Sequence, residues 1–250
     1  MSKELEKIND KLGKSSKGKL DIANGLAAGL AAGLSSIQLP RMFNQLVVFL
    51  LDGSGSMTSK GVSGFSKGNE VHQAVVKVME RLVESKNSSS FDVAFWAFSN
   101  EDIEMSPIKR VTDFDLTKDC FNPCEFITDK KYTKLHSALE KVEIQVNQYL
   151  NKYEGQNRKA LIIILCDGEI HDSSETLGLK TKMDKNDLIT FSSILFESPD
   201  WEEKFGLDFM DKLKRTYSKL ASTQADYMSS VDPEKIRSHM INSVTKVSKY

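Results

Sequence analysis

The chain has 250 residues, of which 40% are hydrophobic and 28% are charged. Its 34 Lys and Arg residues nearly balance its 35 Asp and Glu residues, for a formal net charge of -1. This balance excludes a protein that binds nucleic acid through its overall charge, while the apolar content is sufficient for a folded core. The three cysteines, Cys120, Cys124 and Cys166, are too few for a disulfide framework, and the hydrophilic N-terminus does not resemble a secretory signal. We therefore expect a cytoplasmic protein.

Residues 1–40 differ in composition from the rest of the chain, which we expect to form one domain over 41–250. Residues 22–39 carry no charge and repeat Gly, Ala and Leu. Leu26, Leu30 and Leu34 recur at the spacing of one helix face, so we expect a helix that packs on its own domain or on a partner. The alternatives are a flexible tail and a membrane contact, because this uncharged stretch approaches the length of a membrane span.

From residue 41 onward, apolar runs alternate with amphipathic stretches. The unbroken apolar runs at 46–51 (LVVFLL) and 161–166 (LIIILC) predict central parallel strands that are covered on both faces. Further strands are expected at 91–99, 102–111, 189–196 and 225–228, the first two being joined by a polar turn and giving one antiparallel edge. Helices are expected through Val71, Leu139, Leu213 and Met240. The alternation predicts a doubly wound α/β sheet.

A carboxylate follows each of the two most apolar strands directly. Asp52 opens D-G-S-G-S after the first run, and Asp167 opens D-G-E after the second. Ligands of open α/β sheets bind beyond the carboxyl ends of the strands, so we expect these two side chains to meet there and to need a cation between them. Ser54 and Ser56 add hydroxyl oxygens. This all-oxygen set favours Mg²⁺ or Mn²⁺, and Ca²⁺ less because few carboxylates are available. Each motif taken alone could equally be an ordinary turn.

These motifs, together with Thr133, which is expected to open a helix in TKLHSAL, resemble the von Willebrand factor type A (VWA) domain family with an intact metal-ion-dependent adhesion site (MIDAS). The resemblance extends over about 46–247. It implies a Rossmann-like, mostly parallel six-stranded sheet with one antiparallel edge strand and helices on both faces. The metal ligands that it implies are Asp52, Ser54, Ser56, Thr133 and Asp167. The hydroxyls would meet the metal directly, the carboxylates directly or through water, and an acidic residue of a partner would complete the shell. Cys166 departs from the family, in which Thr or Ser is usual.

Several residues are expected to surround this site. Glu169 is interpreted either as a second acid near the metal or as a solvent-facing side chain. His171 and Asp172 follow closely enough to rim the site, as partner contacts or as polar loop residues. The loops 61–68 and 112–132 are expected to border the same face and to set specificity.

One stretch imitates an enzyme motif. Gly64-Phe65-Ser66-Lys67-Gly68 matches the G-x-S-x-G nucleophile elbow, which must join a strand directly to a helix. The nearest expected strand ends well before it, so a serine hydrolase using Ser66 is kept only as a minor alternative. No G-x-x-x-x-G-K-[ST] sequence is present either, and we expect no enzyme.

The resemblance implies an interaction module that binds an Asp or Glu of a partner protein through Mg²⁺. Short intracellular bacterial members of the family work beside AAA+ ATPases or in stress, tellurite-resistance and phage-defence operons, and we expect a component of such a bacterial multi-protein system. We expect no nucleic-acid partner. The alternative is an assembly or membrane-associated protein in which the Gly/Ala/Leu segment at 22–39 drives oligomerisation.

Overall fold

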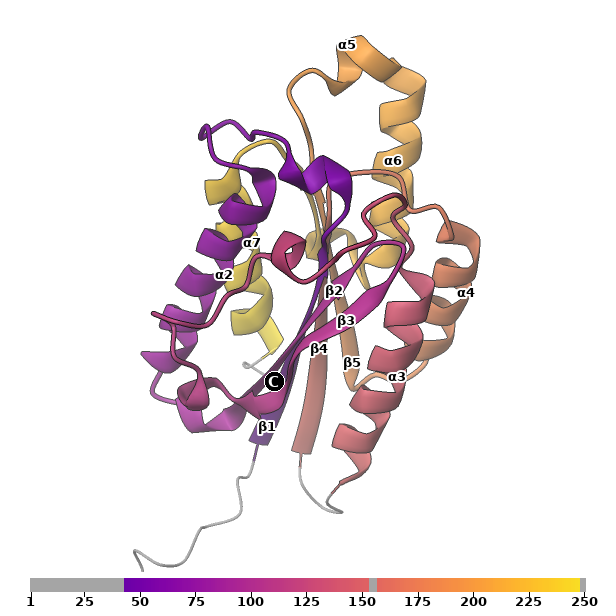
Figure 1. Ribbon diagram of the computed structural model, residues 1–250. Coiled ribbons are helices and arrows are strands. Elements are labelled where there is room, and N and C mark those ends of the chain that lie inside the picture. Colours follow the sequence, from indigo (N-terminus) through magenta and orange to yellow (C-terminus); the bar gives the residue numbers. More distant parts are fainter. Residues whose placement is uncertain (1–42, 153–156, 248–250) are drawn as a thin grey trace, which may run out of the picture. The chain divides into compact units, whose positions relative to one another are not determined.

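The computed structural model describes residues 43–152 and 157–247 (Figure 1). Six strands form one sheet in the order β3-β2-β1-β4-β5-β6. Their bounds are β1 (Phe43–Asp52), β2 (Phe91–Phe98), β3 (Asp102–Arg110), β4 (Asn157–Cys166), β5 (Ile189–Phe196) and β6 (Tyr227–Ser230). Neighbouring strands are parallel except β2 and β3, which form an antiparallel edge. The expected mostly parallel six-stranded sheet is confirmed.

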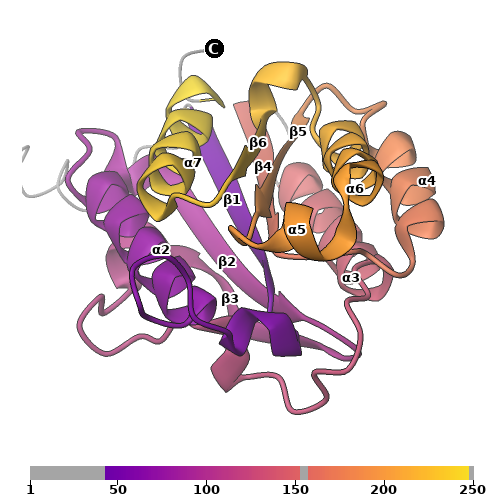
Figure 2. The same ribbon diagram turned by 90° about the horizontal axis from the view of Figure 1, so that it is seen from above.

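Helices cover both faces of the sheet (Figure 2). On one face lie α2 (Lys67–Val83) and α7 (Pro233–Val247). On the other lie α3 (His136–Asn151), α4 (Ser173–Met183) and α6 (Leu207–Leu220). The short helix α5 (Trp201–Phe205) stands above the carboxyl edge of the sheet in both views. The helix α5 and the loops that follow β1 and β4 therefore lie together at this edge.

The two central strands divide their side chains between two cores. Leu46, Val48 and Leu50 of β1 belong to the core under α3 and α6, and Val47, Phe49 and Leu51 to the core under α2 and α7. All six side chains are fully buried. A strand buried on both faces needs apolar residues at successive positions, which is why LVVFLL predicted it correctly. Each of these side chains contributes about 1.5–3 kcal/mol through its burial.

Some expected boundaries were wrong. Thr133 does not open a helix, because α3 begins at His136 with Leu135 as its N-cap. The first half of the strand expected at 225–228 is a 3-10 turn, η5 (Gln224–Asp226), and β6 begins at Tyr227. Sequence analysis also missed α4. Its buried residues are Thr176, Lys180 and Met183, so it lacks the apolar stripe that marks an amphipathic helix.

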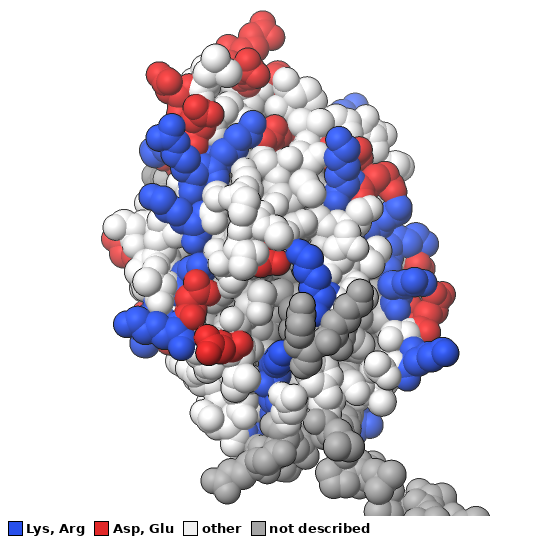
Figure 3. Space-filling model, turned by 180° about the vertical axis from the view of Figure 1, so that it is seen from behind, with Lys and Arg blue, Asp and Glu red and all other residues white. Residues whose placement is uncertain are grey.

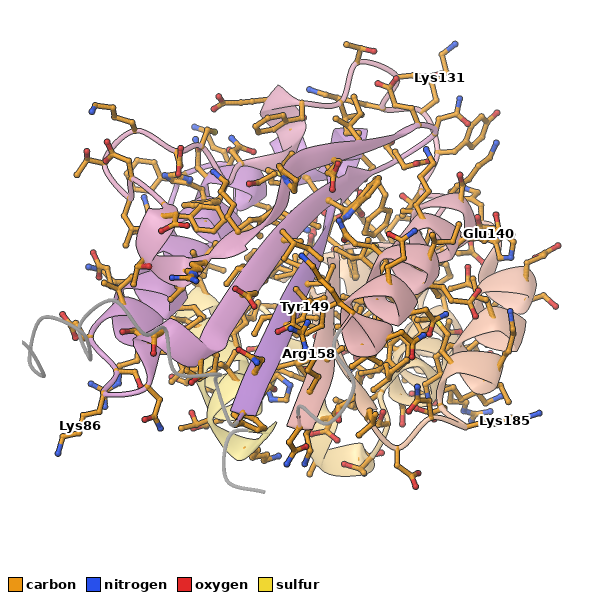
Figure 4. All side chains as sticks on the ribbon, turned by 90° about the horizontal axis from the view of Figure 1, so that it is seen from below. Lys86, Lys131, Glu140, Tyr149, Arg158 and Lys185 are labelled. Carbon is orange, nitrogen blue, oxygen red and sulfur yellow. The ribbon has the colours of Figure 1, made fainter. Side chains whose placement is uncertain are left out.

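The amino edge of the sheet is closed by polar contacts between α3 and two strands (Figure 4). The guanidinium of Arg158 in β4 lies 4.6 Å from the ring centroid of Tyr149, and its Nη1 donates to the Tyr149 carbonyl at 2.8 Å. The Tyr149 hydroxyl in turn donates to Asp92 Oδ2 in β2 at 3.0 Å. These contacts fix the end of α3 that lies farthest from the carboxyl edge.

The Gly/Ala/Leu segment at 22–39 lies outside the described residues. The packed helix, the tail and the membrane contact expected there stay predictions, as does the domain boundary between residues 40 and 41. Among the helices that the structure describes, none is long and apolar enough to cross a membrane.

A buried histidine lies in the contact between α7 and β5. His239 Nε2 is 3.1 Å from the Ser192 hydroxyl. Burial lowers the pKa of His239 below its ordinary value of 6.5, so the ring is neutral in the fold at neutral pH. At pH values below 6.5, His239 binds a proton in the unfolded chain and remains neutral in the folded chain until its lowered pKa is reached. The free energy of unfolding therefore decreases as the pH falls.

We predict that His239→Gln reduces this acid destabilisation. Urea denaturation of the wild type and the variant at about pH 8 and about pH 5.5 measures it, because pH effects from all other groups are common to both chains. The wild type should lose more stability between the two conditions than the variant does. Equal losses would show that His239 is not buried in its neutral form.

Candidate metal site

The two predicted carboxylates meet at the carboxyl edge of the sheet. Asp52 is the last residue of β1, and Asp167 directly follows β4, the strand paired with it in parallel. Both side chains are fully buried. The Tyr217 hydroxyl of α6 donates to the carbonyl of Gly168 at 2.8 Å and fixes the loop that carries Asp167.

The serines of the D-G-S-G-S loop face the same carboxylates. Ser54 N donates to Asp52 Oδ1 at 2.7 Å, and Ser56 Oγ donates to Asp167 Oδ1 at 2.5 Å. The two serine hydroxyl oxygens lie 3.0 Å apart. The structure therefore brings four of the five predicted residues together through side-chain or backbone contacts.

The loop after β1 is tightly backed by the loop 112–132. A Cβ atom on Gly53 would lie 2.6 Å from Ile127 Cγ1 and 2.9 Å from the Pro123 carbonyl, so only glycine fits. Gly55 N also donates to the Lys130 carbonyl at 3.0 Å. The expectation that 112–132 borders the site is confirmed by these contacts.

Thr133, the fifth predicted residue, is buried in the segment before α3. His171 holds it from the loop after β4: His171 N donates to the Thr133 carbonyl at 2.9 Å, and Thr133 N donates to His171 Nδ1 at 3.2 Å. The Asp172 carboxylate accepts from the backbone N–H groups of Leu135 and His136 at 2.9 and 3.0 Å. Sequence analysis interpreted His171 and Asp172 as partner contacts or loop polarity, but both position the segment of Thr133.

Burial and the neighbouring carboxylate of Asp167 both raise the pKa of Asp52. Burial first, and then the charge of Asp167, raise the pKa of Asp52 from 3.8 to about 6. Cys166 Sγ donates to Asp52 Oδ2 at 2.9 Å and offsets part of this rise. Burial also raises the pKa of the Cys166 thiol well above its ordinary range. The thiol therefore stays protonated and acts as a hydrogen-bond donor, at a position where Thr or Ser is usual in the VWA family.

A buried lysine at this site was not predicted from the sequence. Lys67, the first residue of α2, is only 2% exposed, and its Nζ donates to Asp167 Oδ2 at 2.8 Å and to Ser198 Oγ at 2.6 Å. Its ammonium lies 4.9 Å from the centroid of the Trp201 ring. One signal could have revealed it. A cation in the first turn opposes the helix dipole, so a lysine there needs a partner outside the helix.

A pocket of about 380 Å³ opens over these residues. It is lined by the predicted ligands Ser54, Ser56, Thr133 and Asp167, by Lys130, Lys131, Glu169 and His171, by the glycines Gly55 and Gly168, and by the aromatic residues Trp201, Phe205 and Phe209. Glu169 lies on the rim, where it pairs with Lys212 at 2.6 Å. Half-exposed at this rim, it is not a buried second acid of the site.

The donor set fits a hard divalent cation. The buried Asp167 and three hydroxyl residues line the pocket, and the buried Asp52 is hydrogen-bonded to one of them, Ser54. Oxygen donors of this kind suit Mg²⁺ or Mn²⁺. Within 43–152 and 157–247, no group of three or more His, Cys, Asp or Glu residues is placed to hold a metal. An ion at this site would therefore depend on the hydroxyls and on ligands from outside the chain.

Ser66 does not occupy a nucleophile elbow. It is the N-cap of α2, and its Oγ accepts from Asn69 N at 3.3 Å. The strand before it ends at Asp52, and the η1 turn (Gly55–Thr58) lies between the two. An elbow instead places its nucleophile directly between strand and helix. Ser66 serves to begin the helix that carries Lys67.

We predict that Asp172→Ala destabilises the fold by roughly 1–2 kcal/mol, because the backbone N–H groups at the start of α3 lose their acceptor. Urea denaturation measures the change. Asp172→Asn should cost less because the amide keeps one acceptor oxygen, and Ser174→Ala, at an exposed neighbouring position, serves as the control. A loss no larger than that of the control would contradict a capping role for Asp172.

Comparison with known proteins gives a family and a set of similar folds. Residues 47–232 match the von Willebrand factor type A domain family. The fold is similar to that of the pilus adhesin SpaC from Lactobacillus rhamnosus GG, with 13% sequence identity, a TM-score of 0.64, and coverage of 84% of this chain and 31% of that chain. No curated protein sequence matches the chain significantly.

Two further structures have a similar fold. The vWF domain of the type V pili tip protein Mfa5 from Porphyromonas gingivalis is 10% identical, with a TM-score of 0.57 and coverage of 84% of this chain and 96% of that one. Proximal thread matrix protein 1 from the mussel byssus, described with a zinc-occupied MIDAS motif, is 13% identical, with a TM-score of 0.53 and coverage of 82% and 46%. At such identities the likeness shows the fold alone, and this chain spans less than half of the adhesin and of the byssus protein.

Proposed function

The chain belongs to the von Willebrand factor type A domain family, and on that premise we propose that it is a non-enzymatic interaction module that binds a protein partner through Mg²⁺. The observation that carries this proposal is that Asp167 and the hydroxyl residues line one pocket, with a second buried carboxylate, Asp52, hydrogen-bonded to Ser54. The proposed ligands are Asp52, Ser54, Ser56, Thr133 and Asp167. A bound Mg²⁺ would supply a positive charge with coordination sites left for an Asp or Glu of the partner.

The residues around the pocket support an acidic partner. Lys130 and Lys131 line it and would attract a carboxylate. Phe205 and Leu207 beside it are 54% and 64% exposed, a large apolar exposure for a monomer surface. We therefore propose that the partner presents its acidic residue next to a bulky apolar one. The acidic residue gives direction through the metal, and the apolar neighbour adds buried area.

On one face of the molecule, the charge distribution favours a protein partner over a polyanion. On the described part of the face in Figure 3, positive and negative side chains are interspersed around a largely uncharged centre. Nucleic-acid binding depends on a continuous basic surface.

The family resemblance also supports a cellular setting. We propose that the chain works in a bacterial multi-protein system of the stress, tellurite-resistance or phage-defence type, beside an AAA+ ATPase. We further propose a cytoplasmic location, for which the support is that all three cysteines are free, as expected in a reducing compartment.

We predict that Ser54→Ala weakens Mn²⁺ binding at least about tenfold, because one of few protein ligands is lost. Isothermal titration with Mn²⁺ measures the affinity, and Ser89→Ala, in the turn before β2 at the amino edge of the sheet, is the matched control. Capture of a partner by the tagged wild type should likewise disappear in EDTA and in the double variant Asp52→Ala, Ser54→Ala. Capture that survives in both would refute the metal bridge.

We predict that Mn²⁺ affinity falls with pH below about 6, the value to which the pKa of Asp52 is raised. The metal binds the ionised carboxylate, so protons compete with it, and at about pH 5 the affinity should be about tenfold weaker than at about pH 7.5. Asp52→Asn should bind weakly and with a flatter pH dependence. If the wild type and this variant show the same dependence, Asp52 does not contact the metal.

A further inference from the structure

We propose that Lys67 is a counter-ion within the proposed metal site. It weakens the binding of the metal alone, and it leaves the metal-bound site with a net positive charge that selects an anionic ligand. This inference rests on the proposed function and concerns the partner group that the same site accepts. It makes Lys67 a specificity-determining residue that does not itself touch the ligand.

The two oxygens of Asp167 are divided between two sets of contacts. Oδ1 accepts from Ser56 Oγ, on the side of the predicted hydroxyl ligands, and Oδ2 accepts from Lys67 Nζ. The ammonium is therefore bonded to a different oxygen of Asp167 from the one that is bonded to the predicted ligand Ser56. Lys67 and a divalent ion can share Asp167 as a common anion, so each reduces the attraction that Asp167 exerts on the other.

The ammonium is fixed in place by its surroundings. Ser198 Oγ accepts its second hydrogen bond, and the rings of Trp201 and Phe196 lie 4.9 and 5.6 Å from Nζ. Asp167 lines the pocket, whereas Lys67 is almost completely buried. A solvent-exposed lysine could move away when a metal enters. This one is held by hydrogen bonds and aromatic contacts that a metal in the pocket would not replace.

Counting formal charges shows the consequence. The net charge of Asp52, Asp167 and Lys67 together is one negative charge. A bound divalent ion changes this net charge to one positive charge, which a single carboxylate of a ligand neutralises. Without Lys67, the two carboxylates alone would neutralise the ion, and a further carboxylate would leave the site negative. In low dielectric, uncompensated charge is strongly disfavoured. With Lys67, metal and anionic ligand therefore strengthen each other's binding, and this coupling is reciprocal.

The test measures Mn²⁺ affinity by isothermal titration at about pH 8, with and without acetate as the carboxylate probe and with chloride at matched ionic strength. For Lys67→Met we expect Mn²⁺ alone to bind at least about tenfold more tightly than to the wild type. Acetate should strengthen Mn²⁺ binding to the wild type and strengthen it less, or weaken it, in the variant.

A matched control separates the local effect from the loss of any buried lysine. Lys180 in α4 is also buried, and its Nζ pairs with Asp184 at 2.6 Å and lies near the Phe191 ring. Lys180→Met should leave Mn²⁺ affinity unchanged. Lys67→Gln keeps a donor for Asp167 without the charge, and it should reproduce the tighter binding if Lys67→Met fails to fold.

The outcomes distinguish the two proposals. Equal Mn²⁺ affinities of wild type and both Lys67 variants, or no effect of acetate on the wild type, would overturn the role of Lys67 and leave the metal site standing. If neither the wild type nor any variant binds Mn²⁺, the proposed function itself is overturned. Tighter binding in the Lys67 variants together with lost acetate coupling supports the inference.

Discussion

The structure depends on one unfavourable arrangement, the burial of two carboxylates at adjacent ends of the central strands. Asp52 and Asp167 repel each other in a medium that solvates neither, and the raised pKa of Asp52 is a direct result. The surrounding residues reduce that cost. Asp52 accepts from the backbone N–H of Ser54 and from the Cys166 thiol, and Asp167 accepts from the Ser56 hydroxyl and from the Lys67 ammonium. A fold that keeps such a pair has a use for it, and cation binding is the use that the donor set favours.

The sheet and much of the site could be predicted from the sequence because both depend on short-range patterns. LVVFLL and LIIILC are apolar at every position because both faces of β1 and β4 are covered, and the residue after each run must lie at the carboxyl edge. Thr133 was placed at the site by family resemblance, yet its position at the start of a helix was wrong. The actual start is set by the carboxylate of Asp172, which is distant in the sequence.

The features that could not be predicted are tertiary contacts between residues that belong to no recognisable motif for those contacts. Lys67 belongs to a stretch that looked like an enzyme motif, and only the fold brings it to Asp167 and Ser198. His171 and Asp172 looked like loop residues because their partners are backbone groups, which leave no trace in a motif. Helix α4 escaped for a related reason. Its buried positions include Thr176 and Lys180, which hydrogen-bond to Asp172 and Asp184. Because both residues are polar, the sequence pattern does not indicate that they are buried.

The position of α5 has a consequence for how the domain can diverge. Its first residue, Trp201, packs on the Lys67 ammonium, whereas Phe205 at its end and Leu207 just beyond are largely exposed. The helix is thus constrained at one end and free at the other. Substitutions at the free end can change the shape offered to a partner without disturbing the charges that hold the site together. The surface beside the proposed metal site can therefore vary in sequence without changing the proposed ligands of that site.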